Sequence, residues 1–357
     1  MIKVLIVDDS SFMRVKIRTL LESCSDIKVV GIARDGMDAL RKTIILKPDV
    51  ITMDINMPDM SGIKAVELIM QQCPTPIIMI SSLTNKGTYE TIEALEKGAV
   101  DYIHKDNLTE EILIEKISLA TNARLNISRK TEKRFPDNFL GKKREEIVSE
   151  DIKPAKTPEP PARVHRSFSI IGIGISTGGP SALAKVLPGI SPEIPASIVI
   201  AQHMPSAFTR PLAERLDRIS RLTVKEATNG ETLLPGHAYI CPGGKHIMIE
   251  QKGIVSLYDR EKFPDYHFIP SATLLMSSIS RVYEENALCI IMTGMGSDGL
   301  DGIIEAKKRG SYVIAQSENS SVIFGMPKAV ISNNLQDEIV HLDDIAGRIN
   351  DLCLASS

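Results

Sequence analysis

The sequence predicts an α/β protein with two doubly wound domains, each built around a parallel sheet. Short apolar segments alternate with amphipathic segments over residues 1–120, and the alternation resumes at residue 167. The stretch between them is dense in charged residues and proline (KPAKTPEPPARVH), which makes it too polar to bury a core. The length of 357 residues also suggests two domains. We therefore expect domains at residues 1–123 and 167–357, joined by a polar, proline-rich linker at 124–166.

Strand candidates in the first domain are short apolar segments bounded by turn residues. Five occur, at residues 3–8, 28–33, 50–54, 76–81 and 100–105. Helical periodicity fills the gaps, for example over residues 12–23 and 62–72. Strands that alternate with helices favour a parallel sheet covered on both faces.

The second domain shows the same alternation. Its strand candidates lie at residues 169–175, 196–202, 237–242, 246–250, 254–259, 288–294 and 312–316. The region 223–259 is rich in strands with short turns, which indicates a β-hairpin excursion from the main sheet.

Composition argues against several classes of protein. The net charge of −3 provides no basic field, so we expect no nucleic-acid partner. No apolar run approaches the length of a membrane span, and the opening residues lack a signal peptide's cleavage region. The five cysteines form no CxxC pair, so neither structural zinc nor a disulfide framework is expected. We expect a cytoplasmic protein with no membrane insertion.

Charged and polar side chains stand at the carboxyl ends of the predicted strands of the first domain. In chain order they are Asp8 and Asp9, Asp54, Ser81 and Lys105. These ends face one crevice in an open parallel sheet. Converging carboxylates call for a cation, and oxygen ligands suit Mg²⁺. A metal beside Asp54 would offset the charge of an incoming phosphoryl group, to which Ser81 and Lys105 would bind.

The segments VDDSSFMR, ITMDINMPDMSG, IIMISSLT and GAVDYIHK resemble a response-regulator receiver domain over about residues 1–120. The resemblance implies a flavodoxin-like (βα)5 fold. It implies that Asp54 is the phosphoacceptor, and that Asp8, Asp9 and Asp54 bind Mg²⁺ together with the backbone carbonyl of Asn56. A histidine kinase is then the expected phosphodonor.

The same resemblance implies a switch built from Ser81 and Tyr102, with Lys105 sensing the phosphate. One position departs from the pattern. Receivers usually have proline after this lysine, and Asp106 stands there instead. We therefore expect the backbone after Lys105 to differ from that of most receivers.

The string IIGIGISTGGPSAL joins an apolar strand, a glycine-rich turn and the start of a helix. A dinucleotide-binding fingerprint fails because Thr177 stands where the third glycine of G-x-G-x-x-G is needed, and a phosphate loop fails because no Gly-Lys-Ser/Thr is present. The run from Gly174 to Gly178 instead satisfies G-x-S-x-G, a nucleophile elbow with Ser176 at its centre.

A serine nucleophile needs a base that is oriented by a carboxylate. His203 follows the strand candidate at 196–202, and Asp298 lies just past the one at 288–294. Both can therefore meet Ser176 beyond the carboxyl ends of parallel strands. Among the other histidines, His267 in a loop is the serious rival.

The segments ISTGGPSAL, AQHMPSAFTRPLAERL, LPGHAYICPGGKHI, TGMGSDGLDG and IAQSENSSVIFGMPKAV resemble the catalytic domain of the chemotaxis protein-glutamate methylesterase family, from about residue 168 to 350. The resemblance implies Ser176 as nucleophile, His203 as base and Asp298 as its orienting acid. It places Thr177 beside the catalytic pair and implies that the backbone N–H of Met295 stabilises the oxyanion. It implies no cofactor for hydrolysis.

Two features depart from the family pattern. Ile175 precedes the serine, where a small residue is usual and where a large one could crowd the elbow. The segment HFIPSATLLM (267–276) replaces a motif similar to H-R-P-S-V-D-V-L-F. Phe268 and Ile269 stand in place of His-Arg, and Thr273 stands in place of the aspartate. We expect hydrolysis to survive and substrate affinity or receptor choice to be affected.

The leading hypothesis is an enzyme that hydrolyses glutamate γ-methyl esters on methyl-accepting chemotaxis receptors and is controlled by phosphorylation through a chemotaxis histidine kinase. The resemblance also allows deamidation of receptor glutamine. In this hypothesis the unphosphorylated receiver docks over the catalytic crevice. The alternative is a non-catalytic response regulator that acts by partner binding, motivated by the altered segment 267–276. A DNA-binding regulator fits poorly, because no basic helix-turn-helix follows the linker.

Overall fold

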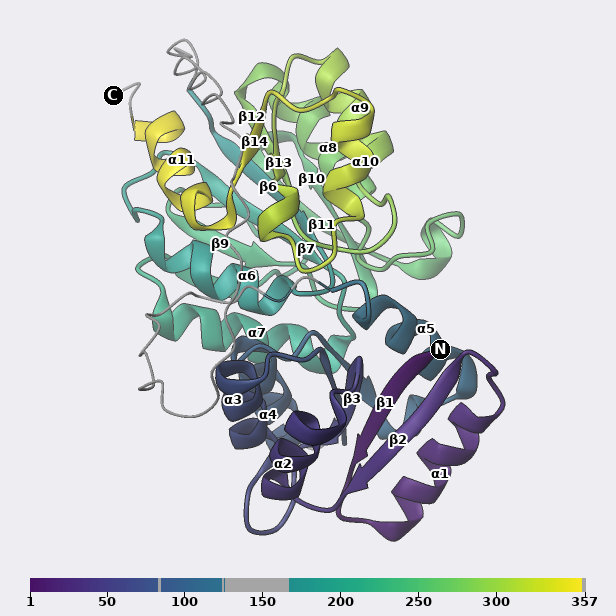
Figure 1. The fold of residues 1–357 in the computed structure, drawn as a ribbon. Helices are drawn as coiled ribbons and strands as arrows, with labels where there is room; N and C mark the ends of the chain where they lie inside the picture. Colours follow the sequence, from purple (N-terminus) through teal and green to yellow (C-terminus); the bar gives the residue numbers. More distant parts are fainter. Residues whose placement is uncertain (83–84, 124, 126–166, 355–357) are drawn as a thin grey trace, which may run out of the picture.

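A computed structural model of the chain shows two separate parallel sheets, each flanked by helices (Figure 1). The residues that the structure describes are 1–82, 85–123, 125 and 167–354. The predicted linker at 124–166 lies outside them apart from Leu125, so the domain boundaries stay a prediction. None of the helices in these ranges combines the length and the apolar character needed to cross a bilayer.

The N-terminal sheet has five strands in the order β2-β1-β3-β4-β5, and all neighbours are parallel. The strands are β1 (Ile2–Val7), β2 (Ile27–Ala33), β3 (Val50–Asp54), β4 (Ile77–Ser81) and β5 (Asp101–His104). Because both faces of the central strands are apolar, helices cover both sides. One side carries α1 (Ser11–Glu22) and α5 (Glu110–Ala120), and the other carries α2 (Gly36–Leu46), α3 (Gly62–Gln72) and α4 (Asn85–Glu96). This confirms the predicted doubly wound fold.

The C-terminal sheet has seven parallel strands in the order β14-β13-β12-β6-β7-β9-β8. They are β6 (Ile170–Ile175), β7 (Ser197–Gln202), β8 (Thr223–Glu226), β9 (His237–Ile240), β12 (Ala287–Ile291), β13 (Tyr312–Gln316) and β14 (Glu338–Val340). On one face lie α6 (Gly179–Val186), α7 (Ser206–Ile219) and α11 (Leu342–Leu354). On the other lie α8 (Ala272–Tyr283), α9 (Leu300–Lys308) and α10 (Met326–Ser332).

The predicted β-hairpin is present but shorter than the region 223–259. The strands β10 (Lys245–Glu250) and β11 (Ile254–Asp259) pair antiparallel, in a small sheet of their own. The strands β8 and β9 instead extend the main sheet in parallel. Short 3-10 turns complete the described elements, at Lys105–Asn107, Leu187–Gly189, Gln251–Gly253, Arg260–Lys262, Glu284–Asn286 and Glu318–Ser320.

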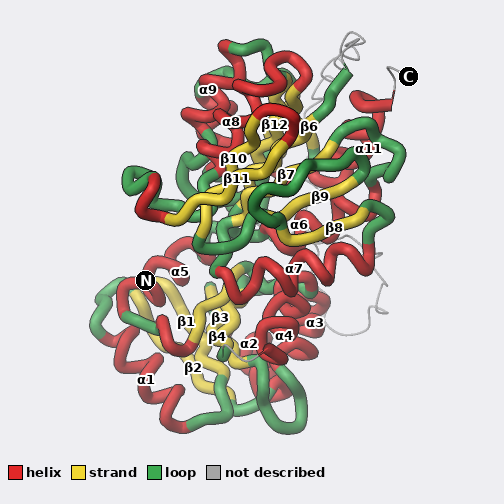
Figure 2. The backbone as a smooth tube through the Cα atoms, turned by 180° about the vertical axis from the view of Figure 1, so that it is seen from behind, coloured by secondary structure: helices red, strands yellow, loops and turns green. Residues whose placement is uncertain are grey.

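The two halves of the chain pack against each other through α4 and α7, which lie side by side in both views (Figures 1 and 2). Tyr102 of β5 packs against Phe208 of α7, with ring centroids 4.5 Å apart and the planes tilted by 42°. The buried apolar cluster on this side of the C-terminal sheet continues into the core under α3 and α4. The carboxyl edge of the C-terminal sheet therefore faces the N-terminal half.

Candidate active site

Ser176 lies on the sharp turn between β6 and α6. Gly178 in this turn has a left-handed backbone with φ of 80°, and a Cβ atom there would lie 2.7 Å from Val322. Glycine is the residue that tolerates both constraints. The turn is tied to the neighbouring strand end because the N–H of Ser176 donates to the carbonyl of Thr293 at 3.0 Å. The predicted elbow is thus a real strand-to-helix turn.

The loop after β12 approaches this turn closely. A Cβ atom on Gly294 would lie 2.7 Å from the Cβ of Ser176, so only glycine lets the two segments meet. The hydroxyl of Thr293 donates to the carbonyl of Thr177 at 3.0 Å and ties the loop to the turn again. As a result, Met295 is held at the edge of the same cavity as Ser176.

His203 follows β7 and lies beside β6, because its N–H donates to the carbonyl of Ile175 at 3.1 Å. Its Nε2 lies 2.8 Å from Oδ2 of Asp298. An ionised carboxylate only accepts, so Nε2 carries the hydrogen and Nδ1 is left with a lone pair. Nδ1 is buried and has no partner among the described residues. The histidine is therefore in the tautomer that a general base requires.

Asp298 is held by the N-terminus of α8. Its carboxylate accepts hydrogen bonds from the N–H groups of Ala272 (2.7 Å), Thr273 (3.0 Å) and Gly299 (2.9 Å), and from the hydroxyl of Ser271 (3.0 Å). Burial by itself would raise the pKa of Asp298, but the bond to His203 and these donors outweigh it and lower the pKa to about 2. The carboxylate stays ionised and orients the imidazole.

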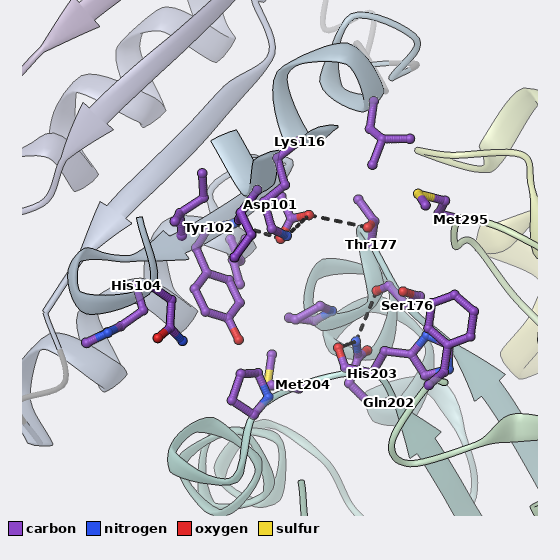
Figure 3. A pocket seen from close by; sticks show the side chains of 18 of the residues that line it. Asp101, Tyr102, His104, Lys116, Ser176, Thr177, Gln202, His203, Met204 and Met295 are labelled. Atoms are coloured by element: carbon purple, nitrogen blue, oxygen red, sulfur yellow. Dashed lines mark hydrogen bonds and ion pairs between the residues drawn. The ribbon is translucent and has the colours of Figure 1, made fainter. Parts of the chain in front are cut away.

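A cavity of about 610 Å³ contains both Ser176 and His203 (Figure 3). No hydrogen bond joins the Ser176 hydroxyl to His203 in the described part of the chain. Such contacts are often loose before a substrate binds, so this does not exclude the pair. The backbone N–H groups of Thr177 and Met295 also have no partner among the described residues, and both residues line the cavity. They are available to an oxyanion.

Gln202 has a role that sequence reasoning missed. Its Nε2 donates to the carbonyl of Ser176 at 3.0 Å and to that of His203 at 3.1 Å, so one buried amide links the two residues (Figure 3). The available signal was a polar residue at the end of an otherwise apolar strand. His246 of β10 is a second supporting residue outside the sequence prediction. It is buried, and its Nδ1 accepts from the N–H of Ser271 at 3.2 Å, which supports the segment that holds Asp298.

The other predicted features of this site can now be placed. His267 lines the cavity, but Asp298 pairs with His203 instead. Ile175 is fully buried in the apolar cluster and does not line the cavity, so it does not crowd the elbow. Thr273, in place of the family's aspartate, accepts from the N–H of Gly299 through its hydroxyl at 2.8 Å.

In the N-terminal half, Asp8, Asp9 and Asp54 offer carboxylate oxygens within 4.8 Å of one another. One oxygen of Asp8 is buried without a partner, and burial together with the charge of Asp54 raises the pKa of Asp8 to about 6. Crowded, desolvated carboxylates with an unsatisfied oxygen suit a hard cation, so these residues fit Mg²⁺. Asn56 lies two residues after Asp54, and its role as a carbonyl ligand stays a prediction.

Lys105 reaches this acidic site. Its Nζ lies 2.8 Å from Asp54 and 4.0 Å from Asp8. The residue after it, Asp106, lies in a 3-10 turn, and its N–H donates to Nδ1 of His104 at 3.1 Å. The missing proline therefore leaves the lysine in place.

The two residues of the predicted switch are separate in this structure. The Ser81 hydroxyl bonds that of Thr91 on α4 at 2.6 Å. Tyr102 packs against Phe208 and lines the cavity that holds Ser176. Tyr102 therefore lies at the contact between the two halves, and its switch role stays a prediction.

The N-terminal half also touches the candidate site directly. Asp101 at the start of β5 accepts a hydrogen bond from the Thr177 hydroxyl at 3.4 Å and pairs with Lys116 at 2.7 Å (Figure 3). The cavity is lined by residues of β5 and α5 as well as by Ser176 and His203. The N-terminal half thus forms one wall of the cavity that holds Ser176 and His203.

Comparison with known proteins identifies both halves. Residues 4–118 match the response regulator receiver domain, and residues 171–349 match the CheB methylesterase domain. A protein-glutamate methylesterase/protein-glutamine glutaminase of Lawsonia intracellularis is 43% identical over 353 residues, which cover 98% of each chain. One of Halalkalibacterium halodurans is 42% identical over 361 residues, which cover 99% of this chain and 98% of that protein.

Among solved structures, the Thermotoga maritima CheB methylesterase catalytic domain is 38% identical. The match covers 52% of this chain and 99% of that one, with a TM-score of 0.49. The two family matches define a receiver domain joined to a methylesterase domain. The chain belongs to the protein-glutamate methylesterase/protein-glutamine glutaminase family.

Proposed function

We propose that this protein hydrolyses glutamate γ-methyl esters on chemotaxis receptors, with Ser176, His203 and Asp298 as its triad. The observation that carries the proposal is the pairing of His203 with an anchored, ionised Asp298 in the cavity that holds Ser176. Both relatives are named for esterase and glutaminase activities. Glutamine deamidation is therefore the second reaction of the same site.

The reaction follows from the available donors and acceptors. The Ser176 hydroxyl attacks the ester carbonyl while Nδ1 of His203 takes its proton, and Asp298 stabilises the imidazolium. The N–H groups of Thr177 and Met295 donate to the oxyanion. His203 returns the proton to the leaving methoxide, so methanol departs and an acyl-enzyme remains. Water activated by His203 then releases glutamate, and an amide substrate would release ammonia by the same steps.

The receiver domain supplies control. We propose that a chemotaxis histidine kinase phosphorylates Asp54, with Lys105 and Ser81 binding the phosphoryl group. Asp8, Asp9, Asp54 and the Asn56 carbonyl would hold Mg²⁺, which when bound would offset the phosphoryl charge. A cytoplasmic location, supported by five free cysteines, suits both a kinase partner and receptor tails.

The altered segment 267–276 motivated a non-catalytic alternative. The bonds to Asp298 from this segment run through the backbone of Ala272 and Thr273 and the hydroxyl of Ser271. A backbone N–H group remains when its side chain is replaced. Thr273, in place of the family's aspartate, therefore still donates its N–H to Asp298. These hydrogen bonds to Asp298 favour the catalytic function over the non-catalytic alternative.

The test is methanol release from methylated receptor membranes, with acetyl phosphate and Mg²⁺ present. Ser176→Ala should lower the rate by about three orders of magnitude or more, since triad members act as a unit. Ser181→Ala, one turn into α6, is the matched control and should keep the wild-type rate. A Ser176→Ala enzyme with near-normal activity, or a wild-type enzyme that releases no methanol, would contradict the proposal.

A further inference from the structure

The His203 ring is held by more than its bond to Asp298. The Phe268 ring lies flat against it, with centroids 4.7 Å apart and 4° between the planes. Phe268 stands where the resemblance implies a histidine. Although it is a large apolar side chain, 38% of its surface is exposed, so it contributes less to the core than a buried ring. Its position calls for an explanation other than burial.

A histidine ring needs restraint about its last torsion, because that torsion has broad wells. The bond from Nε2 to Asp298 restrains one point on the ring. Nδ1 makes no bond among the described residues, and so it does not hold the other side. A flat aromatic face restrains the whole plane, since tilting the imidazole would bring it into collision with the phenyl ring.

Phe268 is itself well placed to act as a fixed surface. Three residues later, Ser271 bonds both Asp298 and Nδ1 of His246. On the other flank lies Gly296, which has no side chain; a Cβ atom added there would lie 3.6 Å from the Phe268 ring. The segment from Phe268 to Thr273 therefore contacts both members of the pair, His203 through a ring face and Asp298 through hydrogen bonds.

We propose that Phe268 is a positioning residue that fixes the plane of the His203 imidazole and keeps Nδ1 directed at Ser176. The inference rests on the proposed esterase function. In this chain the stack takes the place of the polar His-Arg pair that the resemblance implies. Flatness, rather than apolar volume, is the property that the site requires.

Two substitutions separate flatness from volume. Phe268→Leu keeps an apolar side chain of similar size but removes the flat face. Phe268→Tyr keeps the face and adds a hydroxyl at Cζ, the ring atom that lies nearest Gly296. The control is Tyr258→Leu, which removes a ring of the neighbouring hairpin. The Tyr258 ring packs on Phe263, whereas the ring contact of His203 within the described ranges is with Phe268.

The full-length, phosphodonor-activated protein is assayed by methanol release from methylated receptor membranes. Phe268→Leu should lower kcat about tenfold to a hundredfold and leave KM within about twofold, because misplacement of a base affects the chemical step. Phe268→Tyr should restore kcat, and Tyr258→Leu should match the wild type.

A second readout does not depend on activity. Side-chain ¹⁵N spectra of histidine-labelled protein should show sharp His203 signals from a single tautomer, protonated at Nε2. The His203 signals are assigned by their loss in His203→Gln. The His203 signals should broaden in Phe268→Leu and recover in Phe268→Tyr. Wild-type kcat or unchanged ring signals in Phe268→Leu would overturn the inference. A wild-type protein that releases no methanol would overturn the proposed function, and the ring signals would then decide the inference alone.

Discussion

Removing the Arg215 guanidinium should release the receiver domain from the catalytic cavity without phosphorylation. Arg215 on α7 bridges to Glu96 on α4 of the receiver. Its Nε donates to both carboxylate oxygens at 3.1 Å, and its Nη2 lies 2.9 Å from Oε2. Beside this pair, Tyr89 of the receiver donates to Glu214 of α7. Arg215 thus makes a charged contact between α7 and the receiver.

The size of the effect follows from exposure. A fork-shaped Arg–carboxylate pair is a strong contact when it is desolvated. Here the Arg215 side chain is 40% exposed and that of Glu96 is 12% exposed, so solvent screens the pair. The loss of the pair should weaken docking by about 1 kcal/mol. That free energy corresponds to about a fivefold change in the docking equilibrium.

The assay compares methanol release with and without acetyl phosphate and Mg²⁺. Unphosphorylated Arg215→Ala should release methanol about fivefold faster than the wild type, if the docked form predominates at the start. The phosphorylated rates should be equal, so stimulation falls by the same factor. Arg221→Ala removes an exposed charge just beyond α7 and should change nothing. An unchanged unphosphorylated rate in a phosphorylatable Arg215→Ala protein would refute occlusion by this surface.

Two further predictions concern Asp54 and Asp298. Acetyl phosphate with Mg²⁺ should give an acid-stable, base-labile acyl phosphate on Asp54, which Asp54→Asn should abolish; a labelled peptide from elsewhere in the wild-type chain would sink the assignment. Asp298 has a folded-state pKa lowered from 3.8 to about 2, so its ionisation stabilises the fold above pH 3.8, and this contribution is lost as the pH falls toward about 2. Relative to Asp298→Asn, the wild type should therefore lose about 2 kcal/mol of unfolding free energy between about pH 5 and about pH 2. Urea unfolding at several pH values measures the free energy of unfolding of both proteins. If the difference in this free energy did not vary with pH, the claim that hydrogen bonds to ionised Asp298 stabilise the fold would be wrong.

Residues at strand ends were the most predictable part of the candidate site. Ser176, His203 and Asp298 each follow an apolar strand segment, and Ser176 also lies at the centre of a G-x-S-x-G turn. Parallel strands bring their carboxyl ends to one edge, so a one-dimensional pattern is enough to group these residues. The same reasoning grouped Asp8 and Asp54 around a metal site.

Residues that act on those side chains were harder to predict. The strand β14 has no counterpart among the strand candidates, because it spans only Glu338–Val340 and is too short for a periodic signal. Gln202 bonds two carbonyl groups, and Phe268 stacks on a ring that lies 65 positions earlier in the chain. Neither contact is encoded in a local pattern, because it depends on how loops from different strands meet.

By itself the sequence determined the two α/β folds, the elbow at Ser176 and the two groups of candidate functional residues, around Asp54 and around Ser176. Hydrophobic periodicity and the geometry of parallel strands are enough for this, because both are local rules. Only the tertiary structure decided that α8 anchors Asp298, that Phe268 faces His203 and that Arg215 meets Glu96 across the two domains. These contacts join segments far apart in the chain. Each depends on side-chain packing and on small differences between desolvation and pairing energies, which no sequence pattern records.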